Sequence, residues 1–301
     1  MSCFHPLVFH DLGINKETGK KRVLLVKDFA NDYERFDSKR FIRVPCGRCI
    51  GCRLDYARIW GERCSLEASQ YKENMFLTLT YNDENLPLKV SKEDFDLFIK
   101  RLRNHFKDRK IRFFGCGEYG SKNGRPHYHI IVFNAIFDDL EYLTTKNGNA
   151  YYTSKILEKL WSYGFSMVGE CTFKSCNYTA RYILKKQIGN NKSDEFVKMS
   201  RKPGIGREYF EKHKDEFLID NMIHFSFDEN KKSASINRYF KKLYENLDYE
   251  TNNELDELAR KRIEEKMKSE MQVLGLEKEI DYYNLKKNIK KSHIKSLKRS
   301  V

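Results

Sequence analysis

The sequence predicts an α+β fold in which helices flank an antiparallel sheet. Residues 75–186 alternate between apolar strand patterns and three-to-four helical spacing, in the order strand, helix, strand, strand, helix, strand, helix. A short polar loop at residues 120–125 joins the second strand to the third, so these two strands form an antiparallel hairpin. This order is that of a ferredoxin-like arrangement, to which the residues after 188 add a mostly helical C-terminal extension.

Three regions follow from these patterns. Residues 1–72 hold two short strands, a cysteine-rich segment and a helix at 53–72, and residues 73–188 form the core. The core has strands at 75–81, 111–119, 126–133 and 165–171, and helices at 91–109, 154–163 and 175–186. Ser91 and Ser175 are the predicted N-caps of two of these helices.

The rest of the chain carries weaker signals. Residues 134–153 form an insertion, and residues 189–206 form a polar loop or domain boundary. Helices are expected at 208–217 and 235–247. Residues 282–301 contain seven Lys or Arg and no acidic residue, which fits either a solvated tail or a DNA-contacting arm.

Composition indicates a globular protein with an anionic partner. The 301 residues are 40% hydrophobic and 33% charged, with a formal net charge of +14, which favours nucleic acid as the partner. No apolar run approaches the ~20 residues that cross a bilayer. The N-terminal residues lack the basic region and apolar core of a signal peptide. We therefore expect a cytoplasmic protein with no membrane partner and with its eight cysteines reduced.

Three of those cysteines, Cys46, Cys49 and Cys52, are spaced two apart. This spacing suits a structural Zn²⁺ site, for which Cys64 or a histidine such as His5 or His10 would supply the fourth ligand. The spacing fits equally a set of reduced thiols at the start of a helix. Both interpretations remain open from the sequence.

Two histidines begin the strand at 126–133. His127 and His129 are two residues apart, so both imidazoles project from the same face of that strand. Glu118 lies near the loop end of the preceding strand, and the hairpin brings it towards them. Two imidazoles and a carboxylate are a suitable ligand set for a divalent cation.

Two tyrosines share one face of the last core helix. Tyr178 and Tyr182 are four residues apart, and Arg181, Lys185 and Lys186 flank them. An unperturbed phenol has a pKa near ~10, so a nucleophilic tyrosine needs a cation nearby to stabilise its phenolate. The lysines and a bound cation meet that need.

Taken together, three segments resemble the motifs of HUH endonucleases, which initiate rolling-circle replication. They are Phe-Leu-Thr-Leu-Thr-Tyr at 76–81, Arg-Pro-His-Tyr-His-Ile-Ile-Val-Phe at 125–133, and the Tyr178, Tyr182 and Lys185 set. The paired tyrosines are similar to those of microvirus initiators, and Pro-Cys-Gly-Arg-Cys-Ile-Gly-Cys-Arg at 45–53 resembles the gokushovirus branch. The resemblance covers roughly residues 45–186 and leaves the C-terminal region unmatched.

The resemblance implies a site-specific single-strand DNA endonuclease that also rejoins strands. Glu118, His127 and His129 would hold Mg²⁺ or Mn²⁺, and Tyr178 and Tyr182 would be the nucleophiles, with Lys185 stabilising the phenolate or phosphate. Its partners would be single-stranded and origin DNA and the host replicative helicase and polymerase, in the host cell cytoplasm. No small-molecule cofactor is expected. Arg125, Arg181 and Lys186 are further candidates for DNA contacts.

Two other functions compete with this one. A non-catalytic basic protein with a zinc knuckle would bind single-stranded nucleic acid, but it leaves Glu118, the histidine pair and the tyrosine pair unexplained. Plasmid mobilisation relaxases usually carry three histidines and an N-terminal tyrosine, which this chain lacks.

Overall fold

The computed structural model describes residues 3–18, 21–26, 41–120, 124–146, 148–186, 194–216, 222–227, 230–235, 237–245, 261 and 263–297. The chain divides into two compact units, Met1–Asp55 with Glu257–Val301 and Tyr56–Asp256. This division differs from the predicted regions 1–72, 73–188 and 189–301, because the end of the chain folds with its beginning. Arg43 and Glu279, for example, form an ion pair of 2.6 Å. No local sequence pattern carries such a long-range association.

The larger unit is built on a seven-stranded antiparallel sheet of order β10-β5-β6-β4-β9-β8-β7. The strands are β4 (Asn74–Tyr81), β5 (Arg112–Tyr119), β6 (Pro126–Phe133), β7 (Glu141–Lys146), β8 (Asn149–Thr153), β9 (Gly164–Glu170) and β10 (Phe196–Met199). The predicted α+β fold is confirmed. The four predicted core strands lie side by side as β5-β6-β4-β9, which is the ferredoxin-like order.

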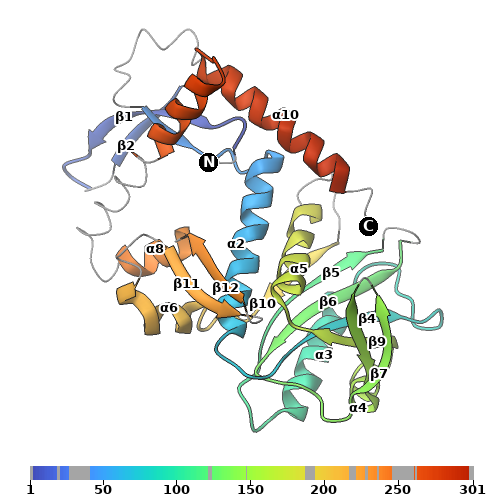
Figure 1. Ribbon diagram of the computed structural model, residues 1–301. Helices are drawn as coiled ribbons and strands as arrows, with labels where there is room; N and C mark the ends of the chain where they lie inside the picture. The colour runs from blue at the N-terminus through green and yellow to red at the C-terminus, as the bar shows by residue number, and fades with distance from the viewer. Residues whose placement is uncertain are drawn as a thin grey trace. The chain divides into compact units, whose positions relative to one another are not determined.

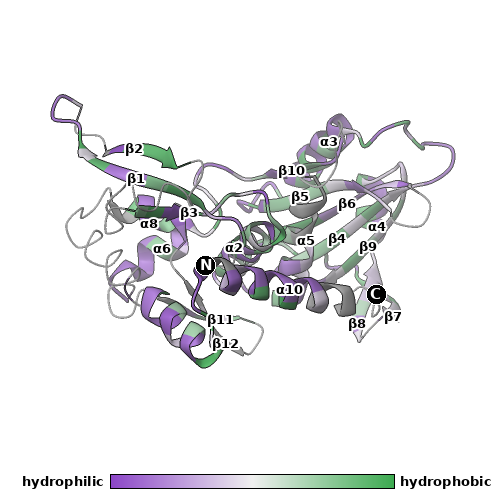
Figure 2. Cartoon of the chain, turned by 90° about the horizontal axis from the view of Figure 1, so that it is seen from above, coloured by the Kyte–Doolittle hydropathy of each residue, from purple (hydrophilic) through white to green (hydrophobic). Residues whose placement is uncertain are grey.

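Helices cover both faces of this sheet (Figure 1). They are α2 (Ile50–Ala68), α3 (Lys92–His105), α4 (Lys155–Leu160) and α5 (Phe173–Lys186). On one face, Phe95 and Phe98 of α3 and Leu157 of α4 pack on Tyr128 and Ile130 of β6. On the other face, Trp60 of α2 and Cys176 of α5 pack on Phe114 and Ile131. The strands are accordingly rich in hydrophobic residues (Figure 2).

Two helix starts test the predicted caps. The Ser91 hydroxyl accepts a hydrogen bond from the Asp94 amide at 3.0 Å, as predicted. Ser175 is not a cap, because α5 begins two residues before it. Thr172 and Ser175 instead exchange side-chain-to-amide hydrogen bonds of 2.8 and 3.2 Å, a reciprocal capping arrangement in which Thr172 is the N-cap.

Several strands were missed by the sequence analysis. The insertion holds the hairpin β7–β8, whose largely exposed residues lack an apolar alternation. The predicted loop at 189–206 contains the edge strand β10, which is only four residues long. The chain after residue 206 contributes α6 (Arg207–His213), the short helix η2 (Lys214–Glu216), the hairpin of β11 (Met222–Phe227) and β12 (Asn230–Ser235), and α8 (Arg238–Glu245). Leu66 of α2 packs in the core of this part, with Phe210 and Phe240.

The smaller unit holds a three-stranded sheet of order β2-β1-β3 and the C-terminal helix. Its elements are β1 (Leu7–Ile14), β2 (Lys21–Val26), β3 (Phe41–Val44) and α10 (Glu279–Leu297), and α2 begins in it. The basic C-terminal residues up to 297 therefore belong to a helix. None of the helices within the described residues is both long and apolar enough to cross a bilayer.

One buried ion pair fastens α2 to the sheet. Glu67 of α2 pairs with Arg112 of β5, and their side chains are 0% and 2% exposed. The second Glu67 oxygen accepts the Gly206 amide at 2.7 Å, and Arg112 donates to the Pro203 carbonyl at 2.8 Å. Every charge is therefore compensated inside the protein, and removing one partner leaves the other buried without its counterion.

We therefore expect Glu67→Gln to lower the free energy of unfolding by about 3–5 kcal/mol. Glu73→Gln is the matched control, since Glu73 pairs with Arg109 at the exposed surface, where such pairs contribute less than about 1 kcal/mol. Urea unfolding followed by tryptophan fluorescence measures both, because Trp60 and Trp161 both lie in the larger unit. Equal losses in the two variants would contradict the expectation.

Candidate metal and nucleophile site

The register of three strands places the predicted ligands on one face of the sheet. Glu118 of β5 lies directly opposite His127 of β6, and on the other side of β6, Thr78 of β4 lies opposite His129. Paired residues of neighbouring strands point to the same face, so these four side chains gather over the middle of the sheet. Tyr128 points to the opposite face, into the core beneath α3 and α4.

The two imidazoles converge on one carboxylate oxygen. The Nε2 atoms of His127 and His129 lie 2.7 and 3.3 Å from Oε1 of Glu118. The Glu118 side chain is 3% exposed, His129 is 7% exposed and His127 is 16% exposed, so the three form a nearly buried group with one accessible side. A buried carboxylate is costly without a positive charge beside it.

The other ring nitrogens fix the orientation of the imidazoles. His127 Nδ1 lies 3.1 Å from the Arg125 carbonyl, which can only accept, so Nδ1 donates and Nε2 is left to act as a ligand. His129 Nδ1 is hydrogen-bonded to the Thr78 hydroxyl at 3.2 Å, and its ring stacks on Phe76 with centroids 5.6 Å apart. Thr78 was noted only for its face in the sequence, and its partner histidine emerges from the strand register.

This donor set fits a divalent cation. One ligand atom from each of Glu118, His127 and His129 lies within 4.8 Å of the others. Two imidazole nitrogens and a carboxylate oxygen suit a transition metal such as Mn²⁺ and leave coordination positions for a substrate. The geometry thus supports the metal site that the sequence predicted.

Helix α5 brings one predicted tyrosine to this group. The ring of Tyr178 lies 5.3 Å from the His129 ring, edge to face, and the residue is 43% exposed. Close packing of α5 on α2 makes this position accessible, because a Cβ atom at Gly61 would come within 2.2 Å of the Asn177 side chain. Tyr178 is therefore both near the ligand group and open to a substrate.

The remaining predicted residues of α5 are Arg181, Tyr182, Lys185 and Lys186. Their backbone belongs to the helix, and their side chains lie outside the described part of the structure. Tyr182 is one helical turn after Tyr178.

Two other tyrosines near the motifs are excluded as nucleophiles. Tyr81 and Tyr128 are buried beneath the opposite face, where their hydroxyls lie 2.6 Å apart. Burial raises the pKa of Tyr81, as do its hydrogen bonds to Tyr128 and Asp94. Burial also raises the pKa of Tyr128, against the lowering effect of the hydrogen bond with Tyr81. Both phenols therefore stay protonated and inaccessible.

Arg125 makes contacts within the protein. Its guanidinium donates to the Tyr81 carbonyl at 2.9 Å and pairs with the exposed Asp83. The side chain thereby ties the start of β6 to the end of β4. Its predicted DNA contact remains a prediction.

A groove with an exposed aromatic residue adjoins the ligand group. Thr80 of β4 lies between His127 of β6 and Phe165 of β9 in the strand register, so all three share one face. Phe165 is 68% exposed and lines the groove together with Thr78 and Met167. The sequence analysis missed Phe165, because a single aromatic residue at a strand start is usually read as core.

The cysteine cluster belongs to the smaller unit. Cys46, Cys49 and Cys52 lie around the start of α2, and the fourth sulfur beside them is that of Cys3. Cys64, which the sequence offered as a fourth ligand, is instead fully buried in the core beneath α5. His5 and His10 are likewise not part of this sulfur group.

Comparison with known proteins gives a consistent result. Residues 74–187 match a family described as replication-associated protein ORF2. The chain is 38% identical to replication-associated protein ORF2 of Spiroplasma virus 4, over 80% of this chain and 79% of that protein. It is 34% identical to replication-associated protein VP4 of Bdellovibrio phage phiMH2K, over 76% and 75% of the two chains. Replication-associated protein ORF4 of Chlamydia phage 1 is 31% identical, over 73% of this chain and 59% of that protein. No solved structure matches the chain at a significant level.

The Thr78 hydroxyl provides a test of the ligand group. Thr78→Val keeps the side-chain shape but removes the partner of His129 Nδ1, so we expect affinity for Mn²⁺ to fall roughly tenfold or more. Electron paramagnetic resonance of free Mn²⁺ during a titration measures the change. Thr80→Val, on the same strand and face but not bonded to either histidine among the described contacts, should leave the affinity unchanged. Equal effects of the two variants would contradict the role of Thr78.

Proposed function

The chain belongs to the replication-associated protein ORF2 family of microvirus replication initiators, and we propose that it nicks and rejoins single-stranded DNA at the replication origin. The observation that carries this proposal is the placement of Tyr178 beside the group formed by Glu118, His127 and His129. A nucleophile, a candidate cation site and an accessible groove on one sheet face are the parts that phosphoryl transfer to a tyrosine requires.

The first step is attack of a tyrosine oxygen on the scissile phosphorus. The bond from phosphorus to the 3′ oxygen breaks, and that oxygen leaves as a 3′-hydroxyl after taking a proton. A 5′-phosphotyrosine link forms in the same step, so one phosphodiester replaces another and no ATP is needed for rejoining. A divalent cation bound by Glu118, His127 and His129 would neutralise charge on the scissile phosphate. Lys185 is proposed to stabilise the phenolate or the phosphate.

Two tyrosines allow the reaction to repeat. Tyr182 would attack the junction regenerated after one round of copying, while the first strand end is still linked to Tyr178. The 3′-hydroxyl freed by this second attack then attacks the Tyr178 link and closes the displaced strand into a circle. Each round thereby consumes one free tyrosine and restores the other.

The substrate and partners follow from this cycle. Single-stranded origin DNA would lie along the groove beside β4 and β9, where Phe165 offers a face on which a base can stack. The 3′-hydroxyl is a primer, so a host polymerase and a strand-separating helicase are the proposed protein partners. Replication of a phage takes place in the host cell, where we propose that the protein acts.

The tyrosines are tested by a covalent adduct. With a single-stranded origin oligonucleotide and Mn²⁺, the protein should give a DNA–protein band on a denaturing gel. Tyr178→Phe and Tyr182→Phe should each leave partial cleavage, whereas the double variant should show none, since each phenol replaces the other only while one is present. Tyr142→Phe, an exposed tyrosine on β7, is the control that should behave as the unmodified protein. Cleavage by the double variant would show that other residues are the nucleophiles, and no adduct with any origin strand would favour the non-catalytic binding protein.

Phe165 and His127 should separate DNA binding from metal binding. Phe165→Ala removes the exposed ring, and we expect roughly tenfold weaker binding of a single strand with unchanged Mn²⁺ affinity. His127→Ala should show the reverse, with metal-dependent cleavage lost and most DNA binding retained. Fluorescence anisotropy of a labelled oligonucleotide without metal measures the first quantity. Unchanged binding by Phe165→Ala would remove the groove from the proposed DNA path.

A further inference from the structure

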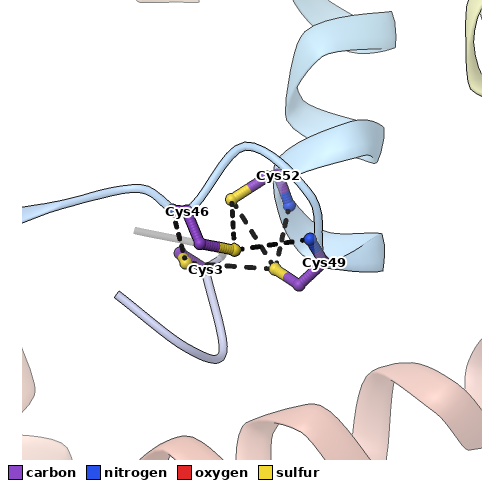
Figure 3. A group of neighbouring side chains, drawn as sticks. All are labelled: Cys3, Cys46, Cys49 and Cys52. Atoms are coloured by element: carbon purple, nitrogen blue, oxygen red, sulfur yellow. Dashed lines mark hydrogen bonds between the residues drawn. The ribbon is translucent and has the colours of Figure 1, made fainter. Parts of the chain in front are cut away.

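The smaller unit contains a second group of metal-binding side chains. The sulfur atoms of Cys3, Cys46, Cys49 and Cys52 all lie within 4.8 Å of one another. Figure 3 shows the four side chains turned towards a common centre, with Cys3 arriving from the N-terminal segment and the others from the start of α2 and the loop before it. All four cysteines are free rather than disulfide-bonded.

The spacing of the sulfurs fits one small tetrahedral ion. The Sγ atom of Cys49 lies 3.6 Å from that of Cys52 and 3.9 Å from that of Cys3, and the Sγ atoms of Cys46 and Cys52 are 3.9 Å apart. Four sulfurs bound tetrahedrally at 2.3 Å from zinc would be about 3.8 Å from one another. An iron–sulfur cluster with four irons would hold them further apart, because each thiolate then binds a different iron.

Backbone amides are directed at these sulfurs. The amides of Phe4 and Cys52 each lie 3.5 Å from Cys49 Sγ, the Cys49 amide lies 3.4 Å from Cys46 Sγ, and the Cys46 amide lies 3.3 Å from Cys3 Sγ. Such donors stabilise negative thiolates rather than neutral thiols. Gly47, with φ +70°, adopts the left-handed conformation that the tight turn between Cys46 and Cys49 requires.

The sheet of the smaller unit explains why Cys3 is the fourth member. Strand β1 pairs antiparallel with β3 so that Leu7 lies opposite Val44. The residues just before β1 therefore lie beside those just after β3, which brings Cys3 to Cys46. This pairing makes the fourth sulfur part of the fold and not a chance neighbour.

We propose that Cys3, Cys46, Cys49 and Cys52 form a structural zinc site that fastens the N-terminal segment to the start of α2. Four thiolates bind zinc without an open position, which is the property of structural sites and not catalytic ones. Zinc is favoured over ferrous iron by the general order of metal affinities. The site is independent of the proposed nuclease chemistry, whose candidate ligands are an oxygen and two nitrogens.

Metal analysis of the full-length protein tests this site. Protein produced with zinc in the medium and dialysed extensively should retain one zinc ion per chain by mass spectrometry of the elements. The double variant His127→Ala with His129→Ala should retain the same amount, which separates this site from the nuclease group. Cys3→Ser and Cys49→Ser should lose most of the zinc, whereas Cys64→Ala, which changes a cysteine of the other unit, should keep it.

Cobalt substitution tests the ligand number without relying on the folding of a variant. The unmodified chain loaded with Co²⁺ should show the intense visible bands and thiolate charge transfer of tetrahedral four-sulfur coordination, and Cys3→Ser should weaken them. Bound iron in place of zinc, zinc that leaves with the two histidines, or a Cys3→Ser protein with an unchanged cobalt spectrum would each overturn the proposal. A mass two hydrogens lower in the zinc-free protein would instead reveal a disulfide and overturn it as well.

Discussion

The register between β6 and its two neighbours is the constraint on which the candidate nuclease site depends. Successive residues of a strand point to opposite faces, so a slip of one residue would turn both histidines into the core beneath α3 and α4. The buried face prevents that slip, because Tyr128, Ile130 and Val132 are all 0% exposed there. Burial of these three apolar side chains contributes the free energy that holds His127 and His129 on the other face. The core of the domain thus sets the geometry of the chemistry.

The same face must be closed for stability and open for a substrate. Helices α2 and α5 cover one end of it, where Trp60, Cys176 and Ala180 exclude water. They leave the end near His127 accessible, where Phe165 and Tyr178 are exposed. Glu118 sits at the boundary with 3% of its side chain exposed, and the imidazoles alone do not supply a fixed positive charge. A cation in this group would offset the cost of burying the carboxylate, so the site gains stability and reactivity from the same ligand.

The sequence was sufficient for the central sheet and for the ligand group, and insufficient for features formed by distant residues. Period-two and period-3.6 patterns predicted the four central strands and the helices between them, and an H-x-H pair on a strand left little choice of face. Cys3 is different, since only the pairing of β1 with β3 brings it to Cys46 across more than forty residues. Cys64 was a reasonable candidate by spacing, yet its apolar neighbours on α2 draw it into the larger core. Strand β10 was missed because four residues carry too little periodicity to stand out.

Ligand chemistry explains how one chain can hold the two proposed metals apart. Zinc binds nitrogen and oxygen ligands more tightly than Mg²⁺ or Mn²⁺ does, so affinity alone would place zinc at Glu118, His127 and His129 as well. Four soft thiolates retain zinc far more strongly than that harder and partly open set, and the geometry around Cys49 allows no further ligand once the tetrahedron is complete. The nuclease group, with three protein ligands and one accessible side, is suited to a metal that exchanges and binds phosphate oxygens. Separation of the metals therefore follows from sulfur against nitrogen and oxygen, and from a closed site against an open one.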